Sequence, residues 1–107
     1  MELNQYEIVL VNLDPTIGSE IKKTRPCLII SPNEMNKFLQ TIIIAPITST
    51  SKAYPTRVEI KRKETKGWVV IDQIRTVDKR RFTKIFGKIS ENEILKIKEV
   101  LKETFVD

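Results

Sequence analysis

Short apolar runs, separated by polar turns, are the feature that most limits how this 107-residue chain can fold. Each run is rich in Ile, Val and Leu and is far shorter than the ~20 residues that a membrane-spanning helix needs. The runs are Glu7–Leu13, Pro26–Ser31, Thr41–Ile47 and Gly67–Asp72, with weaker ones at Thr56–Ile60 and Phe86–Ile89. Runs of this length predict strands. Many short, closely spaced strands favour a barrel-like sheet.

The hydrophobic period changes near the C-terminus. Ser90 and Glu93 have the spacing of a capping box, in which each side chain satisfies a backbone N–H of the other. Apolar residues then recur at helical spacing, at Ile94, Ile97, Leu101 and Phe105. The chain is therefore predicted to be one mainly-β (α+β) domain over residues 1–107, ending in an amphipathic helix.

Composition excludes several kinds of chemistry. The chain has no histidine and a single cysteine, Cys27, so an intrachain disulfide, a cysteine zinc cluster and a Ser-His-Asp triad are all ruled out. We expect neither a metal nor a cofactor. No signal peptide or membrane segment is evident, which predicts a cytoplasmic protein. The net charge of +5 favours an anionic partner, although many basic domains bind none.

Arg25 is the first candidate for chemistry, because it stands directly before Pro26 at the start of a predicted strand. The guanidinium group can grip a phosphate with two parallel hydrogen bonds, and the proline would stiffen the chain behind it. The alternative is an ordinary surface charge or salt-bridge partner.

Hydroxyl and carboxylate groups at other strand ends complete the set of candidates. Thr48, Ser49 and Thr50 follow the third predicted strand, where they either cap a turn or form a rim of donors beside Arg25. Asp72 ends another strand and Glu20 lies in the loop before Arg25, so either could serve as a base. Phosphate chemistry without histidine or metal points to RNA, whose 2′-hydroxyl is a nucleophile already tethered beside the phosphorus.

Basic and polar side chains around these positions are candidates for contacts with RNA. The DKRR turn at Asp78–Arg81 is the densest basic cluster, and a solvated turn is its alternative interpretation. Trp68 is expected in the core rather than as a base-stacking surface. The candidate RNA-binding residues are Ser19, Lys22, Lys23, Ser49, Thr50, Gln73, Arg75, Lys79 and Arg80.

Five motifs, in order along nearly the whole chain, resemble those of the MazF/PemK toxins of bacterial toxin–antitoxin pairs. They are EIVLVNLDPTIGSE, KKTRPCLIIS, IIIAPITS, YPTRVEI and VIDQIRTVDKRR. The resemblance implies an SH3-like barrel with a C-terminal helix, acting as a homodimer. It implies metal-independent cleavage of single-stranded RNA at short motifs, leaving a 2′,3′-cyclic phosphate and a 5′-hydroxyl. It also implies a MazE-like antitoxin with a disordered acidic tail.

The resemblance assigns roles to individual residues. The family's catalytic arginine falls on Arg25 and its threonine on Thr48, while family acids fall on Glu20 and Asp72. Some PemK-type relatives have histidine where this chain has Ser19 and arginine where it has Val70, so mechanisms that use those side chains are closed here. Two other functions stay open: a toxin of the same fold that inhibits DNA gyrase by binding, and a non-catalytic RNA-binding module.

Overall fold

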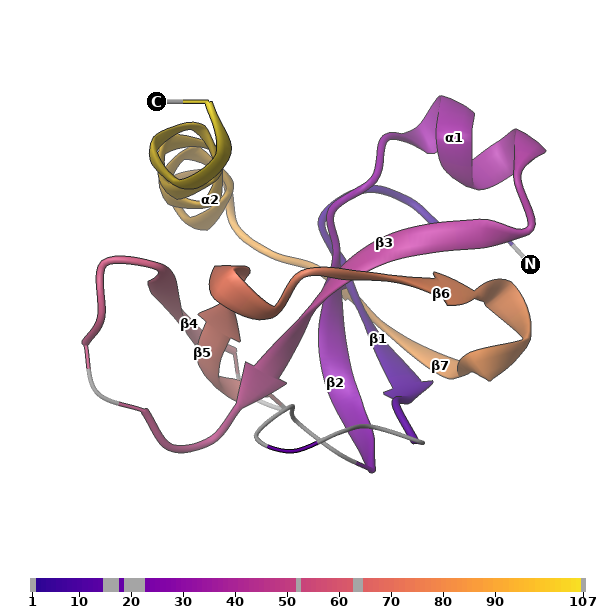
Figure 1. The fold of residues 1–107 in the computed structure, drawn as a ribbon, viewed down its shortest axis with the longest axis horizontal. Helices are drawn as coiled ribbons and strands as arrows, with labels where there is room; N and C mark the ends of the chain where they lie inside the picture. Colours follow the sequence, from indigo (N-terminus) through magenta and orange to yellow (C-terminus); the bar gives the residue numbers. More distant parts are fainter. Residues whose placement is uncertain (1, 15–17, 19–22, 52, 63–64, 107) are drawn as a thin grey trace.

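A computed structural model describes residues 2–14, 18, 23–51, 53–62 and 65–106. Strands dominate, and a helix closes the chain (Figure 1). The strands are β1 (Glu7–Asn12), β2 (Thr24–Ile29), β3 (Thr41–Thr48), β4 (Arg57–Lys61), β5 (Lys66–Val70), β6 (Arg75–Asp78) and β7 (Phe82–Lys88). The helices are α1 (Asn33–Phe38) and α2 (Glu91–Phe105), with 3-10 turns η1 (Ile71–Gln73) and η2 (Lys79–Arg81).

The strands form an antiparallel sheet in the order β4-β5-β3-β2-β1-β7, and β6 also pairs with β3. Strand β3 is the hub, because its first half pairs with β6 and its last two residues pair with β5. This exchange of partners along one strand bends the sheet toward a barrel. The prediction of a mainly-β, barrel-like domain with a C-terminal helix is confirmed.

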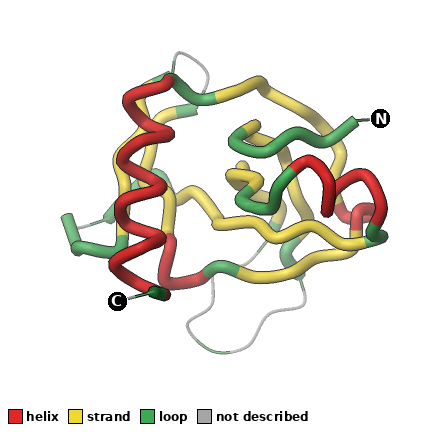
Figure 2. The backbone as a smooth tube through the Cα atoms, turned by 90° about the horizontal axis from the view of Figure 1, so that it is seen from above, coloured by secondary structure: helices red, strands yellow, loops and turns green. Residues whose placement is uncertain are grey.

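Both faces of the central strands are buried. One face packs with β4, β5 and α2 in a cluster that includes Ile8, Leu28, Ile60 and Ile97. The other packs with β6 in a cluster that includes Val9, Cys27 and Ile44. Figure 2 shows α2 lying along one side of the strands. The capping box at Ser90 and Glu93 is present, as predicted.

The structure corrects the predicted strands in three places. The strand predicted over Gly67–Asp72 ends at Val70, because the chain turns through η1 as Ile71 enters the core. Strand β6 was not predicted, and β7 starts at Phe82 rather than Phe86.

Two aromatic predictions also need correction. Phe105, expected on the apolar face of the helix, is 57% exposed in the last turn, since the buried contacts of α2 come from earlier turns. Trp68, expected in the core, is only partly buried. Among the described residues, no helix is long and apolar enough to cross a membrane.

Candidate functional site

Two prolines end the pairing between β2 and β3. The ladder runs from Ile29–Ile44 to Cys27–Pro46 and stops there, and β3 then pairs with β5. Proline has no N–H to donate, so Pro26 and Pro46 are poor positions for continuing a ladder. Arg25 and Thr48 lie two residues beyond the last pair, one on each strand. They continue the face that carries Cys27, because side chains alternate along a strand.

Arg75 reaches the same end of the sheet from β6. Its Nη1 donates to the Leu13 carbonyl over 3.2 Å, just after β1. Burial raises the pKa of the Cys27 thiol to about 12, opposed by the positive charges of Arg75 and Arg25. The Arg75–Leu13 hydrogen bond puts Arg75 at the end of β1, the strand that pairs with Arg25.

The neck of the loop before Arg25 is closed by hydrogen bonds. Leu13 N donates to the Lys23 carbonyl over 3.0 Å, and Lys23 N donates to Asp14 Oδ1 over 2.9 Å. Arg81 Nη1 donates to the carbonyls of Asn12, over 3.2 Å, and Asp14. Arg81 was missed as a candidate, although it belongs to the DKRR turn. The predicted site residues Ser19, Glu20 and Lys22 lie outside the described residues.

Thr48 ends β3 with its hydroxyl turned into the following loop. Thr48 Oγ1 donates to the Thr50 carbonyl over 3.1 Å, while Ser49 and Thr50 are exposed. Gly67 of β5 packs so tightly beneath it that an added Cβ would overlap the Thr48 carbonyl oxygen. The Thr50 carbonyl, which accepts from its hydroxyl, and the backbone of Gly67, which packs against its carbonyl, therefore set the position of Thr48.

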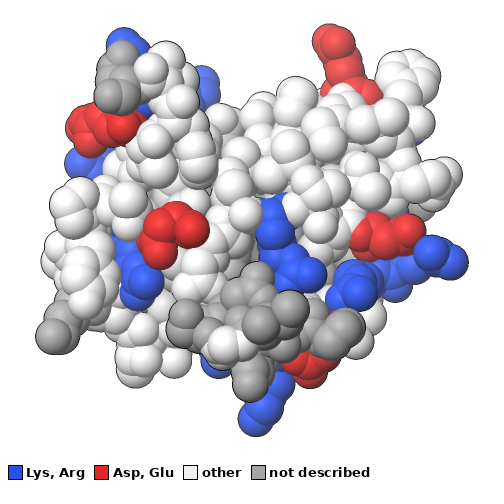
Figure 3. Space-filling model, viewed as in Figure 1, with Lys and Arg blue, Asp and Glu red and all other residues white. Residues whose placement is uncertain are grey.

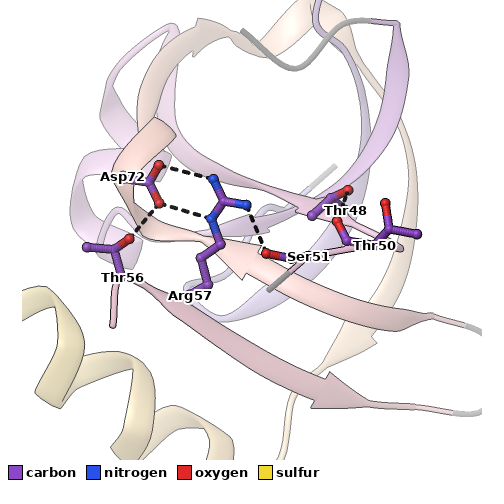
Figure 4. Close-up of polar contacts among 6 residues, drawn as sticks. All are labelled: Thr48, Thr50, Ser51, Thr56, Arg57 and Asp72. Carbon is purple, nitrogen blue, oxygen red and sulfur yellow. Dashed lines mark hydrogen bonds and ion pairs between the residues drawn. The ribbon is translucent and has the colours of Figure 1, made fainter. Parts of the chain in front are cut away.

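Arg57 joins three separate segments beside Thr48 (Figure 4). Its Nη1 donates to Ser51 Oγ over 2.8 Å, and its Nε and Nη2 face the two Asp72 oxygens at 3.4 and 3.5 Å. Thr56 Oγ1 also donates to Asp72 Oδ1, over 2.8 Å. The β3–β4 loop is thereby tied to η1. Sequence analysis missed Arg57, and the YPTRVEI motif that contains it was the available signal.

These contacts decide the protonation of Asp72. Partial burial acts to raise its pKa, but the hydrogen bonds from Thr56 and Arg57 outweigh burial and leave the pKa below its ordinary value. Asp72 is therefore ionised at neutral pH. Both of its oxygens already accept hydrogen bonds from neighbouring side chains.

Lys79 and Arg80 lie at the other end of β3. The β3–β6 ladder pairs Thr41 with Asp78, which directly precedes them. Arg80 forms an ion pair with Asp78 at 3.0 Å while its own side chain is 89% exposed. Lys79 instead lines a cavity of about 590 Å³ with the N-terminal segment and α1. Both residues follow the Thr41 end of β3, although Arg81, the next residue, reaches the neck of the loop before Arg25. Gln73 lies in η1 next to Asp72.

Both basic and acidic side chains lie on the face drawn in Figure 3. In the view of Figure 3, Lys and Arg side chains gather at the centre of the molecule and at lower right, with acidic side chains lying singly beside them. Within the part of the chain that the structure describes, no three Asp, Glu or Cys side chains are grouped as metal ligands would be.

Comparison with known proteins gives concordant results. Residues 4–105 match the family described as the PemK-like, MazF-like toxin of type II toxin–antitoxin systems. An endoribonuclease MazF of Staphylococcus epidermidis is 36% identical over 105 residues, covering 92% of this chain and 88% of that protein.

Two solved structures are similar in fold. MazF from Deinococcus radiodurans superposes with a TM-score of 0.88 at 24% identity, covering 97% of this chain and 96% of its own. A mycobacterial endoribonuclease, solved in complex with its cognate antitoxin, has a TM-score of 0.81 at 22% identity, covering 94% and 92%.

Proposed function

The chain belongs to the PemK-like, MazF-like toxin family of type II toxin–antitoxin systems and is an endoribonuclease of that family; from this premise we propose that it cuts single-stranded RNA, including mRNA, at a short sequence motif without a metal ion. The 2′-hydroxyl attacks the adjacent phosphorus and the 5′-oxygen of the next nucleotide leaves. The products are a 2′,3′-cyclic phosphate and a 5′-hydroxyl end.

The end of the β2–β3 ladder is the observation that carries this proposal. Arg25 and Thr48 lie two residues beyond the Cys27–Pro46 pair, where the two strands no longer pair with each other. A phosphate between them would meet a guanidinium fork from one strand and a hydroxyl from the other. Arg25 stabilises the charge of the pentacoordinate transition state, and Thr48 exchanges its hydrogen bond to the Thr50 carbonyl for a phosphate oxygen.

The 2′-hydroxyl proton needs an acceptor. Arginine is a poor base because its guanidinium group stays protonated at neutral pH. Asp72 has a lowered pKa and is bound by Thr56 and Arg57, which weakens it as a base. We therefore assign proton transfer to Glu20, in the loop before Arg25, and give Asp72 the role of a positioning residue that holds Arg57.

The remaining predicted residues serve as RNA contacts in this proposal. Arg75 is hydrogen-bonded to Leu13 at the end of β1, the strand that pairs with Arg25, and would neutralise a neighbouring phosphate. Lys79 and Arg80, at the other end of β3, would add only sequence-independent attraction for the backbone. The other proposed contacts are Ser19, Lys22, Lys23, Ser49, Thr50 and Gln73.

Protein partners follow from the family. An antitoxin is the expected inhibitor, and an acidic disordered tail would suit the net positive charge of this chain. We also propose a homodimer. Exposed apolar side chains at the end of α1, Phe38 at 77% and Leu39 at 48%, offer surface for a protein interface.

The test is incubation of the purified protein with a long single-stranded RNA in excess EDTA, with every fragment end mapped. We expect cuts at one repeated short motif, with 5′-hydroxyl ends and cyclic phosphates. Cleavage that requires added Mg²⁺, or 5′-phosphate ends, would reject the proposed chemistry. Binding to RNA without cuts would favour a non-catalytic module, and inhibition of DNA gyrase without cuts would favour a gyrase toxin.

A further inference from the structure

We propose that the ring of Tyr54 is a stacking surface for one base of the RNA and that Arg57 is the positioning residue that holds it. The inference rests on the proposed function and deepens it, because it names how a base, rather than a phosphate, is bound. Tyr54 lies in the β3–β4 loop, and its side chain is 49% exposed.

The loop holds Tyr54 in two ways. Arg57 N donates to the Tyr54 carbonyl over 3.0 Å, which closes a turn with Pro55 at its second position. The Arg57 guanidinium carbon also lies 4.9 Å from the centre of the Tyr54 ring, a cation–π contact. Backbone and side chain of Arg57 therefore fix the same residue.

Arg57 is itself anchored on its other side. Its donors reach Ser51 Oγ and both oxygens of Asp72, so the guanidinium plane cannot turn freely away from the ring. The anchor makes the ring a preformed surface, and a preformed surface binds a partner without first losing side-chain entropy. A rigid exposed ring supported by a cation on one side leaves aromatic area for a second planar group.

The position of the ring suits a nucleobase near the scissile phosphate. Thr48 donates to Thr50, Ser51 accepts from Arg57, and Arg57 contacts Tyr54, so a short series of contacts joins the catalytic threonine to the ring. Aromatic side chains beside a basic backbone track are the common means of holding single strands, because every base has a π-face.

The test measures binding of two uncleavable ligands, a random-sequence pool of 2′-O-methyl RNA and an abasic ribose-phosphate oligomer of the same length. Three variants are compared with the wild type: Tyr54→Leu removes the aromatic ring, Tyr54→Phe keeps it, and Phe105→Leu changes another exposed aromatic residue, 57% exposed at the end of α2. Tyr54→Leu should weaken RNA binding about tenfold. Tyr54→Phe and Phe105→Leu should bind RNA as the wild type does.

The abasic oligomer separates stacking from loop damage. Tyr54→Leu should bind it as tightly as the wild type, because no base is present to stack. Arg57→Met should weaken RNA binding by about threefold, and Arg57→Lys should recover part of the loss. Equal RNA affinity of Tyr54→Leu and wild type, or equal weakening for both ligands, would overturn the inference.

Cleavage of unmodified RNA by the wild-type protein is measured in parallel. Ring-dependent binding without cleavage would support the stacking surface and reject the proposed function. Cleavage together with RNA binding that does not depend on the Tyr54 ring would support the proposed function and reject the stacking surface.

Discussion

The two ends of strand β3 both carry an Arg–Asp ion pair, yet the pairs do different things. At the Thr41 end, Arg80 contacts Asp78, two residues away in the sequence, and its side chain is 89% exposed. At the Thr48 end, Arg57 contacts Asp72 across 15 residues and also reaches Ser51. The Arg80–Asp78 pair lies within one local turn. The second joins a loop, a strand and a 3-10 turn.

The difference shows what makes a charge useful to a site. An ion pair between near neighbours orders only the turn that contains it, and exposure keeps its contribution small. A pair between distant segments holds a loop in one place, and here that loop follows Thr48. The predictions below test whether function depends on the Thr48 end and is nearly independent of the Thr41 end.

The largest effect is expected from the hydroxyl group of Thr48. Thr48→Val has nearly the same shape but no donor, so single-turnover RNA cleavage should fall by about 10²–10³-fold. Thr48→Ser keeps the hydroxyl and should stay within about tenfold of the wild type. Near-full activity of the valine variant would remove Thr48 from the catalytic site.

Gly67→Ala should be the next most severe change. The new Cβ would overlap the Thr48 carbonyl oxygen and lie 3.1 Å from Ile47 Cγ2, so β3 or β5 must move. Overpacking of this kind costs about 1–3 kcal/mol, which should lower the Tm by about 5–15 °C in a calorimetric scan. Lys66→Ala, at the exposed neighbouring position, is the control. An unchanged Tm for Gly67→Ala would mean that the tight contact with Thr48 is absent in solution.

Loss of the Asp72 carboxylate should have a smaller effect that depends on pH. Because the pKa of Asp72 is lowered on folding, its stabilising effect is present above the ordinary aspartate pKa of about 3.9 and disappears as the pH falls through the lowered value. Its side chain is 37% exposed, so screening limits the effect.

At pH 7, Asp72→Asn should lower the Tm by about 1–5 °C. The difference from the wild type should shrink as the pH drops below 4. A difference that stayed constant with pH would show that the ionised carboxylate is not what stabilises this end of β3.

The smallest effect is expected at the Thr41 end. Arg80→Ala and Lys79→Ala should each reduce the slope of log Kd against log salt by about 0.7 and slow cleavage less than about threefold. The slope is measured by titrating RNA at several salt concentrations. A loss of cleavage comparable to that of Thr48→Val would put part of the catalytic site at this end.

Sequence patterns predicted the features that depend on neighbouring residues. The capping box at Ser90 and Glu93 and the main strands were predicted because period and end signals are local. Strand β6 was missed because its four residues, RTVD, carry little apolar pattern of their own, and it forms by pairing with β3.

In the candidate site, too, local motifs predicted individual residues, whereas their spatial relations came only from the structure. Arg25 and Thr48 were selected from their motifs, but only the register of β2 with β3 relates their positions. Arg57 was missed although it stands in the YPTRVEI motif, because its contact with Asp72 joins residues far apart in the chain. Lys79 and Arg80 were selected for local charge density, and the structure puts them at the opposite end of β3 from Thr48.

The most direct measurement is single-turnover cleavage at saturating RNA by Arg25→Ala and Arg80→Ala, side by side in EDTA. If the Thr48 end is the catalytic end, Arg25→Ala should cut at least about 10³-fold more slowly than the wild type, while Arg80→Ala stays within about threefold. Equal losses in the two variants, or near-full cleavage by Arg25→Ala, would contradict that placement.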